Sequence, residues 1–265
     1  MATTKSQKSD EFWRAVQLGL PLPPIKKPFI FNKFLSMLNA AGVRTDRQGS
    51  TISLKPLTDA DITRMSAGAI ENEKITKAKD NTPERGGLFD YAVTGGLQGT
   101  KWSHINLAEP VLNPMFADPA RRLLGMTAKD LEATLFSKGG QRIKDELNKL
   151  DSVKLEAELR ASLKGLKGTA LDNAVKKIKY LKALQKSNLK PGDAYVLTKF
   201  PVLPPVMRPV VAMEGSSASI VGDSNFLYQS AIMHNKALQS QNASKLLPPD
   251  EHTKLRENLY TAVGA

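Results

Sequence analysis

The chain contains no cysteine and only three histidines among its 265 residues. The missing thiols exclude disulfides, cysteine–zinc sites, iron–sulfur clusters and thiol nucleophiles, and so few histidines argue against a metal cage built from protein side chains. No run of 18 apolar residues occurs, so we expect no membrane-spanning helix. The polar residues 1–10 lack the apolar core of a secretory signal. We therefore expect a cytoplasmic protein.

Familiar catalytic motifs are also missing. The sequence has no Gly-Lys-Ser or Gly-Lys-Thr in the frame of a phosphate-binding loop, no Gly-x-Ser-x-Gly and no His-Glu-x-x-His. Nucleotidyl transfer needs carboxylates clustered around two magnesium ions roughly 4 Å apart, whereas the aspartates here are scattered over predicted helix surfaces. The sequence thus predicts neither a catalytic residue nor a metal-ligating residue.

Positive charge is what the chain has in excess. Its 38 Lys and Arg residues stand against 26 Asp and Glu residues, a net charge of +12. Such an excess is typical of proteins that bind nucleic acid, although a lysine-rich soluble protein has it too. Residues 141–190 hold 13 basic and 6 acidic residues, and so more than half of the excess. These charges indicate either a solvated helix face or an interaction surface.

Apolar spacing predicts a mainly helical chain. Helices over 141–163 and 170–186 form a first, basic αα-hairpin, and helices over 225–241 and 250–265 form a second. Two helices alone bury little apolar area, so we expect the second hairpin to be the least stable part of the isolated chain. A shorter helix starts at Thr127.

The remaining segments are shorter. We expect helices over 11–20, 29–41 and 56–66, the last capped by Thr58, and a small hairpin over 43–54. The best strands are predicted over 104–108 and 195–203, and a loop rich in Gly and Ser over 213–224. His104 within the first of these strands is either a catalytic candidate or a structural hydrogen-bonding residue.

Four separated segments carry a recognisable pattern: residues 82–90 (Thr-Pro-Glu-Arg-Gly-Gly-Leu-Phe-Asp), 102–111 (Trp-Ser-His-Ile-Asn-Leu-Ala-Glu-Pro-Val), 200–210 (Phe-Pro-Val-Leu-Pro-Pro-Val-Met-Arg-Pro-Val) and 223–228 (Asp-Ser-Asn-Phe-Leu-Tyr). In order and separation they resemble the N-terminal clamp region of the beta-prime (largest) subunit of multisubunit DNA-directed RNA polymerases. One such motif is weak, but four in register make chance an unlikely explanation.

Two departures from that family matter. The interval that holds a cysteine-bearing zinc ribbon in the bacterial family is only residues 90–101 here, so the resemblance implies no zinc. The chain also stops before the family's magnesium-binding aspartate loop. The first fifty residues match nothing in the family. These departures suggest a reduced version of the subunit, of bacteriophage or mobile-element type.

The predicted fold class is α+β and mainly helical, a polymerase clamp-like module with two αα-hairpins, short strands and no zinc ribbon. We divide the chain into five segments: an N-terminal tail with extra helices (1–50), a clamp base (51–140), the basic hairpin (141–190), the clamp core with a lid-like loop (191–224) and a clamp-helix hairpin (225–265).

The resemblance, together with charge, assigns roles to individual residues. Candidate nucleic-acid contacts are Arg85, Lys199, Arg208, Lys176, Lys177 and Lys179. For Arg85 and Arg208, bracing of the surrounding loops is the other interpretation. The lid-like loop, a predicted steric wedge or else an ordinary flexible loop, includes Glu214, Gly215 and Gly222. Residues predicted to dock a factor are Tyr228, His234, Asn235 and Lys236.

The implied function is a non-catalytic clamp portion of the polymerase, a nucleotidyltransferase. It would hold template DNA and the RNA–DNA hybrid and dock a sigma-like specificity factor. Its partners would be the beta subunit and the rest of beta-prime. It would bind no cofactor, since Mg2+ belongs to another segment or chain. A phage-encoded form would act in the bacterial host cytoplasm, and the virion is a further location.

Two alternatives stay open at this stage. One is a free-standing clamp mimic that binds DNA or an initiation factor and regulates transcription. The other is a basic helical protein that uses the fold for assembly alone.

Overall fold

The computed structural model describes residues 43–45, 52–54, 56–75, 82–212, 219–244 and 248–265. The chain divides into two compact units, residues 1–57 and 58–265. In the first unit, β1 (Val43–Thr45) pairs antiparallel with β2 (Ile52–Leu54), which confirms the small hairpin predicted there. The helices predicted over 11–20 and 29–41 lie outside the described residues.

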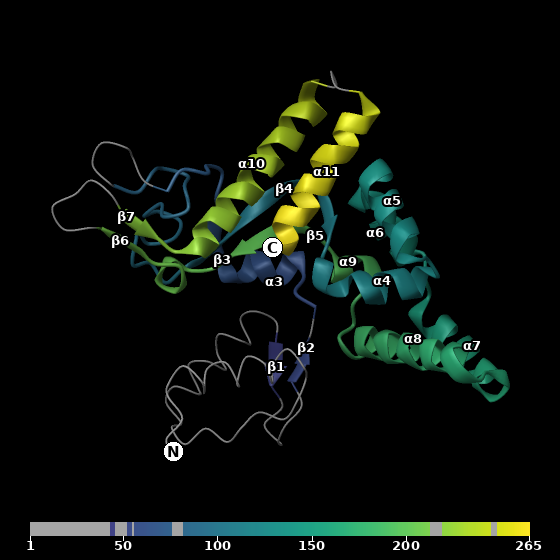
Figure 1. The fold of residues 1–265 in the computed structure, drawn as a ribbon. Coiled ribbons are helices and arrows are strands. Elements are labelled where there is room, and N and C mark those ends of the chain that lie inside the picture. The colour runs from purple at the N-terminus through teal and green to yellow at the C-terminus, as the bar shows by residue number, and fades with distance from the viewer. Residues whose placement is uncertain (1–42, 46–51, 55, 76–81, 213–218, 245–247) are drawn as a thin grey trace, which may run out of the picture. The chain divides into compact units, whose positions relative to one another are not determined.

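The second unit is built around a three-stranded sheet in the order β3-β4-β5 (Figure 1). β3 (Ser66–Ala69) runs parallel to β4 (Trp102–Leu112), and β5 (Val196–Val202) runs antiparallel to β4. Both predicted strands are therefore present, and β4 extends beyond residues 104–108 at each end. His104 is buried, and its Nδ1 lies 2.7 Å from Ser66 Oγ. Burial lowers the pKa of His104, as fits a structural role.

A second, two-stranded sheet takes up residues 219–221 of the predicted loop over 213–224. β6 (Val210–Ala212) pairs antiparallel with β7 (Ser219–Val221), and α10 begins at Asp223. The β-branched residues Ile220 and Val221 favour a strand, a preference that the Gly and Ser of this stretch concealed. Glu214 and Gly215 of the predicted lid lie outside the described residues.

Several short helices begin where their caps predict. Thr58 caps α3 (Asp59–Met65) and Thr127 caps α5 (Ala128–Lys138), each in a reciprocal capping box. Both helix starts were predicted from the sequence. The remaining short elements are η1 (Pro114–Phe116), α4 (Ala117–Leu124), η2 (Leu163–Gly165), α9 (Pro191–Tyr195) and η3 (Pro205–Met207).

The predicted continuous helix over 141–163 is wrong. The segment forms two helices, α6 (Gly140–Asn148) and α7 (Ser152–Ser162), followed by α8 (Gly168–Lys186). Asp151 starts α7, because its Oδ1 accepts hydrogen bonds from the amides of Val153 at 3.0 Å and Lys154 at 3.1 Å. α7 and α8 lie side by side (Figure 1).

The largest core cluster joins these helices to the sheet. Its fully buried members include Ile143 and Leu147 of α6, Leu181 of α8, Leu112 of β4 and Val196 of β5. The basic segment is thus packed against the rest of the unit through α6 and one side of α8. Within the part of the chain that is described, no helix is long and apolar enough to cross a membrane.

The C-terminal helices α10 (Asp223–Ser244) and α11 (Pro249–Gly264) run side by side (Figure 1). Pro249 is the first residue of α11, so the helix begins one residue before the predicted start and Asp250 lies in its first turn. Leu238 and Leu259 bury themselves against Val111 of β4. The two helices therefore pack on the sheet as well as on each other. The expectation that this hairpin is the least stable part of the chain considered the two helices alone.

Candidate functional site

One buried arginine lies where three of the four motif segments meet. Arg208, next to η3, has a side chain with no exposed surface. Its Nε donates to the Leu203 carbonyl at 2.8 Å, its Nη1 to Asn225 Oδ1 at 2.9 Å, and its Nη2 to the Leu88 carbonyl. The guanidinium also lies 4.5 Å from the centre of the Phe89 ring. One side chain thus joins residues 82–90, 200–210 and 223–228.

Asn225 completes this arrangement, which we call the Arg208 brace (Leu88, Phe89, Leu203, Arg208 and Asn225). The Asn225 Nδ2 donates to the carbonyl of Arg208 at 3.0 Å and to that of Gly222 at 3.1 Å. Burial lowers the pKa of Arg208 to about 10, so the side chain stays cationic at neutral pH. The brace therefore fixes the base of the β6–β7 sheet to the start of α10.

This burial decides between the two roles predicted for Arg208. An enclosed guanidinium with its donors on protein oxygens is unavailable to a phosphate, so Arg208 braces the loops and leaves the set of nucleic-acid candidates. Arg85 is exposed. Lys199 is half-buried, and its Nζ donates to Thr63 Oγ1 at 2.7 Å. Of these three predicted nucleic-acid contacts, Arg208 is buried, Lys199 is half-buried and Arg85 is exposed.

The three lysines predicted on the basic segment do not share one face. Lys176 and Lys179 are exposed, whereas Lys177 is half-buried on the other flank of α8. Lys186, ten residues after Lys176, returns to the exposed side, and we call Lys176, Lys179 and Lys186 the α8 lysine face. No ion pair found among the described residues involves these three lysines. The helical spacing between Lys176 and Lys186 could have predicted from the sequence that Lys186 belongs to this face.

The four residues predicted to dock a factor also differ in how accessible they are. Asn235 is buried, with its Oδ1 accepting from the Ala108 amide at 2.7 Å and its Nδ2 donating to the Asn106 carbonyl at 2.8 Å. It binds the backbone of β4 and is therefore unavailable to a docked protein. Tyr228 is half-buried and its hydroxyl accepts from the Leu203 amide at 3.2 Å. Burial raises the pKa of Tyr228.

His234 and Lys236 remain accessible on α10, half-buried and exposed respectively. Lys236 Nζ lies 2.6 Å from Glu73 Oε2, and this hydrogen bond lowers the pKa of Glu73. The same helix exposes apolar side chains that sequence reasoning missed: Phe226 is 54% exposed and Met233 is 59% exposed. Leu227 of the same helix is 45% exposed.

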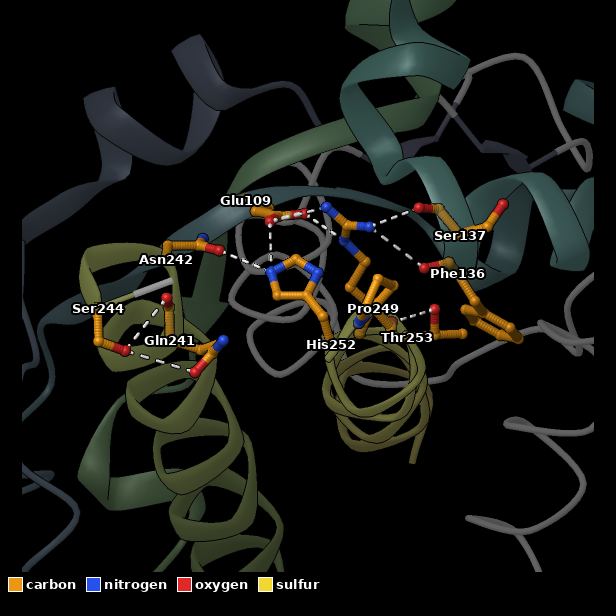
Figure 2. A network of polar contacts seen from close by, with 10 residues as sticks. Glu109, Phe136, Ser137, Gln241, Asn242, Ser244, Pro249, His252 and Thr253 are labelled. Atoms are coloured by element: carbon orange, nitrogen blue, oxygen red, sulfur yellow. Dashed lines mark hydrogen bonds and ion pairs between the residues drawn. The ribbon is translucent and has the colours of Figure 1, made fainter. Parts of the chain in front are cut away.

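A second polar network fixes α11 to the sheet (Figure 2). Arg256 reaches Glu109 of β4 twice, with Nε at 2.7 Å from Oε2 and Nη2 at 3.1 Å from Oε1. Its Nη1 donates to the Ser137 carbonyl at 2.8 Å and to the Phe136 carbonyl at 3.3 Å, at the end of α5. One side chain therefore ties three elements together. Sequence reasoning missed it.

His252 lies beside this ion pair. Its Nε2 is 2.8 Å from Asn242 Oδ1 and 3.7 Å from Glu109 Oε1 (Figure 2). The contact joins α10 to α11 near the ends that the chain connects. In the described parts of the chain, no group of three or more His, Cys, Asp and Glu side chains is placed to hold a metal ion.

The chain is similar to known polymerase subunits. The DNA-directed RNA polymerase subunit beta′ of Chromobacterium violaceum is 34% identical to it over 128 residues, or 46% of this chain and 9% of that protein. The subunit beta′ of Lactobacillus delbrueckii is 34% identical over 122 residues, or 45% of this chain and 10% of that protein. The subunit beta′ of Acholeplasma laidlawii is 24% identical over 274 aligned positions, or 74% of this chain and 20% of that protein.

No protein-family profile matches the chain. The chain spans between about a tenth and a fifth of the length of the curated relatives described above. It therefore contains a segment related to the beta′ subunit, in agreement with the resemblance inferred from the four motifs.

Proposed function

We propose that the chain is the clamp portion of a multisubunit DNA-directed RNA polymerase, contributing to transcription without supplying catalytic residues. The observation that carries this proposal is the Arg208 brace. Three segments singled out by their likeness to beta-prime are far apart in sequence, yet they meet at one buried cation. Conserving the architecture of a beta-prime clamp is the simplest reason for such motifs to occur in one chain.

In this role the chain contacts template DNA and the RNA–DNA hybrid through phosphates. The α8 lysine face suits that purpose, because its lysines have no carboxylate partners among the described residues and Asp172 is the sole acid of α8. Arg85 and Lys199 are further candidate contacts. Phosphate contacts give affinity without sequence readout, so binding depends on salt and not on base sequence.

A charge-matched comparison tests this face. We expect the variant Lys176→Ala/Lys179→Ala/Lys186→Ala to bind a DNA–RNA scaffold more weakly than the parent chain. If all three lysines contact phosphates, the slope of log affinity against log salt falls by roughly 2–3. Fluorescence anisotropy at several salt concentrations measures that slope.

The control removes the same charge elsewhere. Lys129, Lys138 and Lys254 are exposed on α5 and α11, and their replacement by alanine lowers the net charge equally. The control variant should keep the parent slope. Equal slopes for the parent chain and the α8 variant would place the binding face elsewhere.

The proposal extends to partners. The beta subunit and the remainder of beta-prime would surround this chain, and one of them would hold the catalytic Mg2+. A sigma-like specificity factor would dock on α10 and α11, with His234 and Lys236 as accessible polar contacts and Phe226 and Met233 as apolar ones. Such a reduced subunit suits a phage-encoded polymerase acting in the bacterial cytoplasm.

Activity of the purified assembly tests the proposed function. A tagged chain isolated from cells that naturally make it should bring down template-directed, Mg2+-dependent RNA synthesis. The recombinant chain alone should incorporate no nucleotide. Incorporation by the pure chain, abolished by EDTA, contradicts the non-catalytic role. An inactive assembly containing only an initiation factor favours the free-standing clamp mimic instead.

A further inference from the structure

An open depression of about 510 Å³ lies beside the Glu109–Arg256 pair. Four elements contribute to it: α5, β4, α10 and α11. Apart from Pro249, its lining residues have polar or charged side chains, among them Glu109, Gln241, Asn242, Asp250, His252 and Arg256. Figure 2 shows how most of these side chains gather between the ends of α10 and α11. We call it the Glu109 depression.

Gln241 gives the first indication of a ligand. The residue is only 7% exposed, yet its side-chain nitrogen has no hydrogen-bond partner in the described part of the chain. Its side-chain oxygen has only a long contact, 3.5 Å from Ser244 Oγ. Whichever way the amide is oriented, one polar atom at the edge of the depression lacks a good partner. Among the described residues, Ser103 Oγ is the only side-chain polar atom that is both buried and without a partner, so the free amide atom of Gln241 is accessible. An accessible amide donor on a depression can bind a ligand's carbonyl.

The charges of the lining residues give the second indication of a ligand. Glu109 and Asp250 contribute two negative charges to the lining, and Arg256 contributes one positive charge, in a chain whose net charge is +12. Arg256 takes one bond to each oxygen of Glu109, which leaves further lone pairs on that carboxylate. Among the described residues, Asn242 Oδ1 also accepts a single bond, from His252. The acceptors therefore outnumber the donors that satisfy them.

We infer that the Glu109 depression binds an arginine side chain of a partner protein. The planar guanidinium offers five N–H donors, which match the carboxylates of Asp250 and Glu109 and the oxygen of Asn242. Gln241 then donates to the carbonyl of the same arginine. This inference goes beyond the proposed function, because it concerns a site on the isolated chain and names the chemistry of the group it accepts.

Two small probes test the site on the full 265-residue chain. N-acetyl-arginine methylamide carries the guanidinium, and N-acetyl-citrulline methylamide is its uncharged counterpart of nearly the same shape. We expect the arginine probe to shift the side-chain amide resonances of Gln241 and Asn242 saturably. Its affinity should exceed that of the citrulline probe about tenfold, the value of one charge-assisted hydrogen bond.

Two variants distinguish the site from general charge attraction. Asp250→Asn should remove most of the preference for arginine. Glu251→Gln removes the same charge from the neighbouring exposed residue, which does not line the depression, and should leave the preference intact. Equal binding of both probes, no shift at Gln241, or equal losses in the two variants would overturn the inference. None of these outcomes depends on whether a polymerase assembles around the chain.

Discussion

Replacing Arg208 with alanine should lower the free energy of unfolding of the chain by roughly 3–5 kcal/mol. The change leaves the oxygens of Leu203, Asn225 and Leu88 without their donor and opens a cavity beside Phe89. Part of this loss is offset because a buried cation no longer has to be desolvated. Urea denaturation followed by circular dichroism measures the change.

The control is Arg85→Ala. Arg85 belongs to the same group of motifs but is exposed, so its replacement should change the unfolding free energy by no more than about 0.5 kcal/mol. Arg208→Lys keeps the charge but loses the fork of donors, and it should lie between the two. If the variants Arg208→Ala and Arg85→Ala have equal free energies of unfolding, the brace does not hold the motifs together.

Replacing Arg256 with alanine should release α11 from β4 and α5. Its side chain is only 17% exposed and makes two bonds to Glu109 and two to carbonyls of α5. Losing them should lower the local opening free energy by about 2–3 kcal/mol. Amide hydrogens of α11 should then exchange roughly 30- to 150-fold faster, while those of α6 keep their rates.

Lys254→Ala is the matched control for that measurement. Lys254 is exposed on the same helix and takes part in no ion pair found among the described residues. Its loss should leave exchange in α11 almost unchanged. Equally fast exchange in the parent chain and in Arg256→Ala would mean that the ion pair does not anchor the helix.

Local signals predicted local structure well. The capping boxes at Thr58 and Thr127 involve residues three apart, so a reader of the sequence sees both partners at once. The strand predicted over 104–108 likewise rests on neighbouring residues alone, and it lies within β4. The break before α7 has no such signal, because leucine spacing continues through it and Asp151, whose side chain starts the new helix, also fits a place on a helix surface.

The Arg208 brace and the Arg256–Glu109 pair depend on contacts between residues far apart in the sequence, which no local pattern reveals. Arg208 and Leu88 are 120 residues apart, and Arg256 and Glu109 are 147 apart. The motifs marked Arg208 as important, but burial, and therefore bracing rather than phosphate binding, follows only from the packing of three segments. Asn235 had no cue to its role, since its partner is the backbone of β4.

The central claim is that this chain works as one part of a larger RNA polymerase. Mass spectrometry of the proteins that co-purify with the tagged chain from its native cells tests it most directly. The account predicts, in stoichiometric amount, a beta-like subunit and a polypeptide that carries the three-aspartate magnesium loop. If the chain purified from those cells, at salt low enough to preserve assemblies, carries no such polypeptide, the central claim is contradicted.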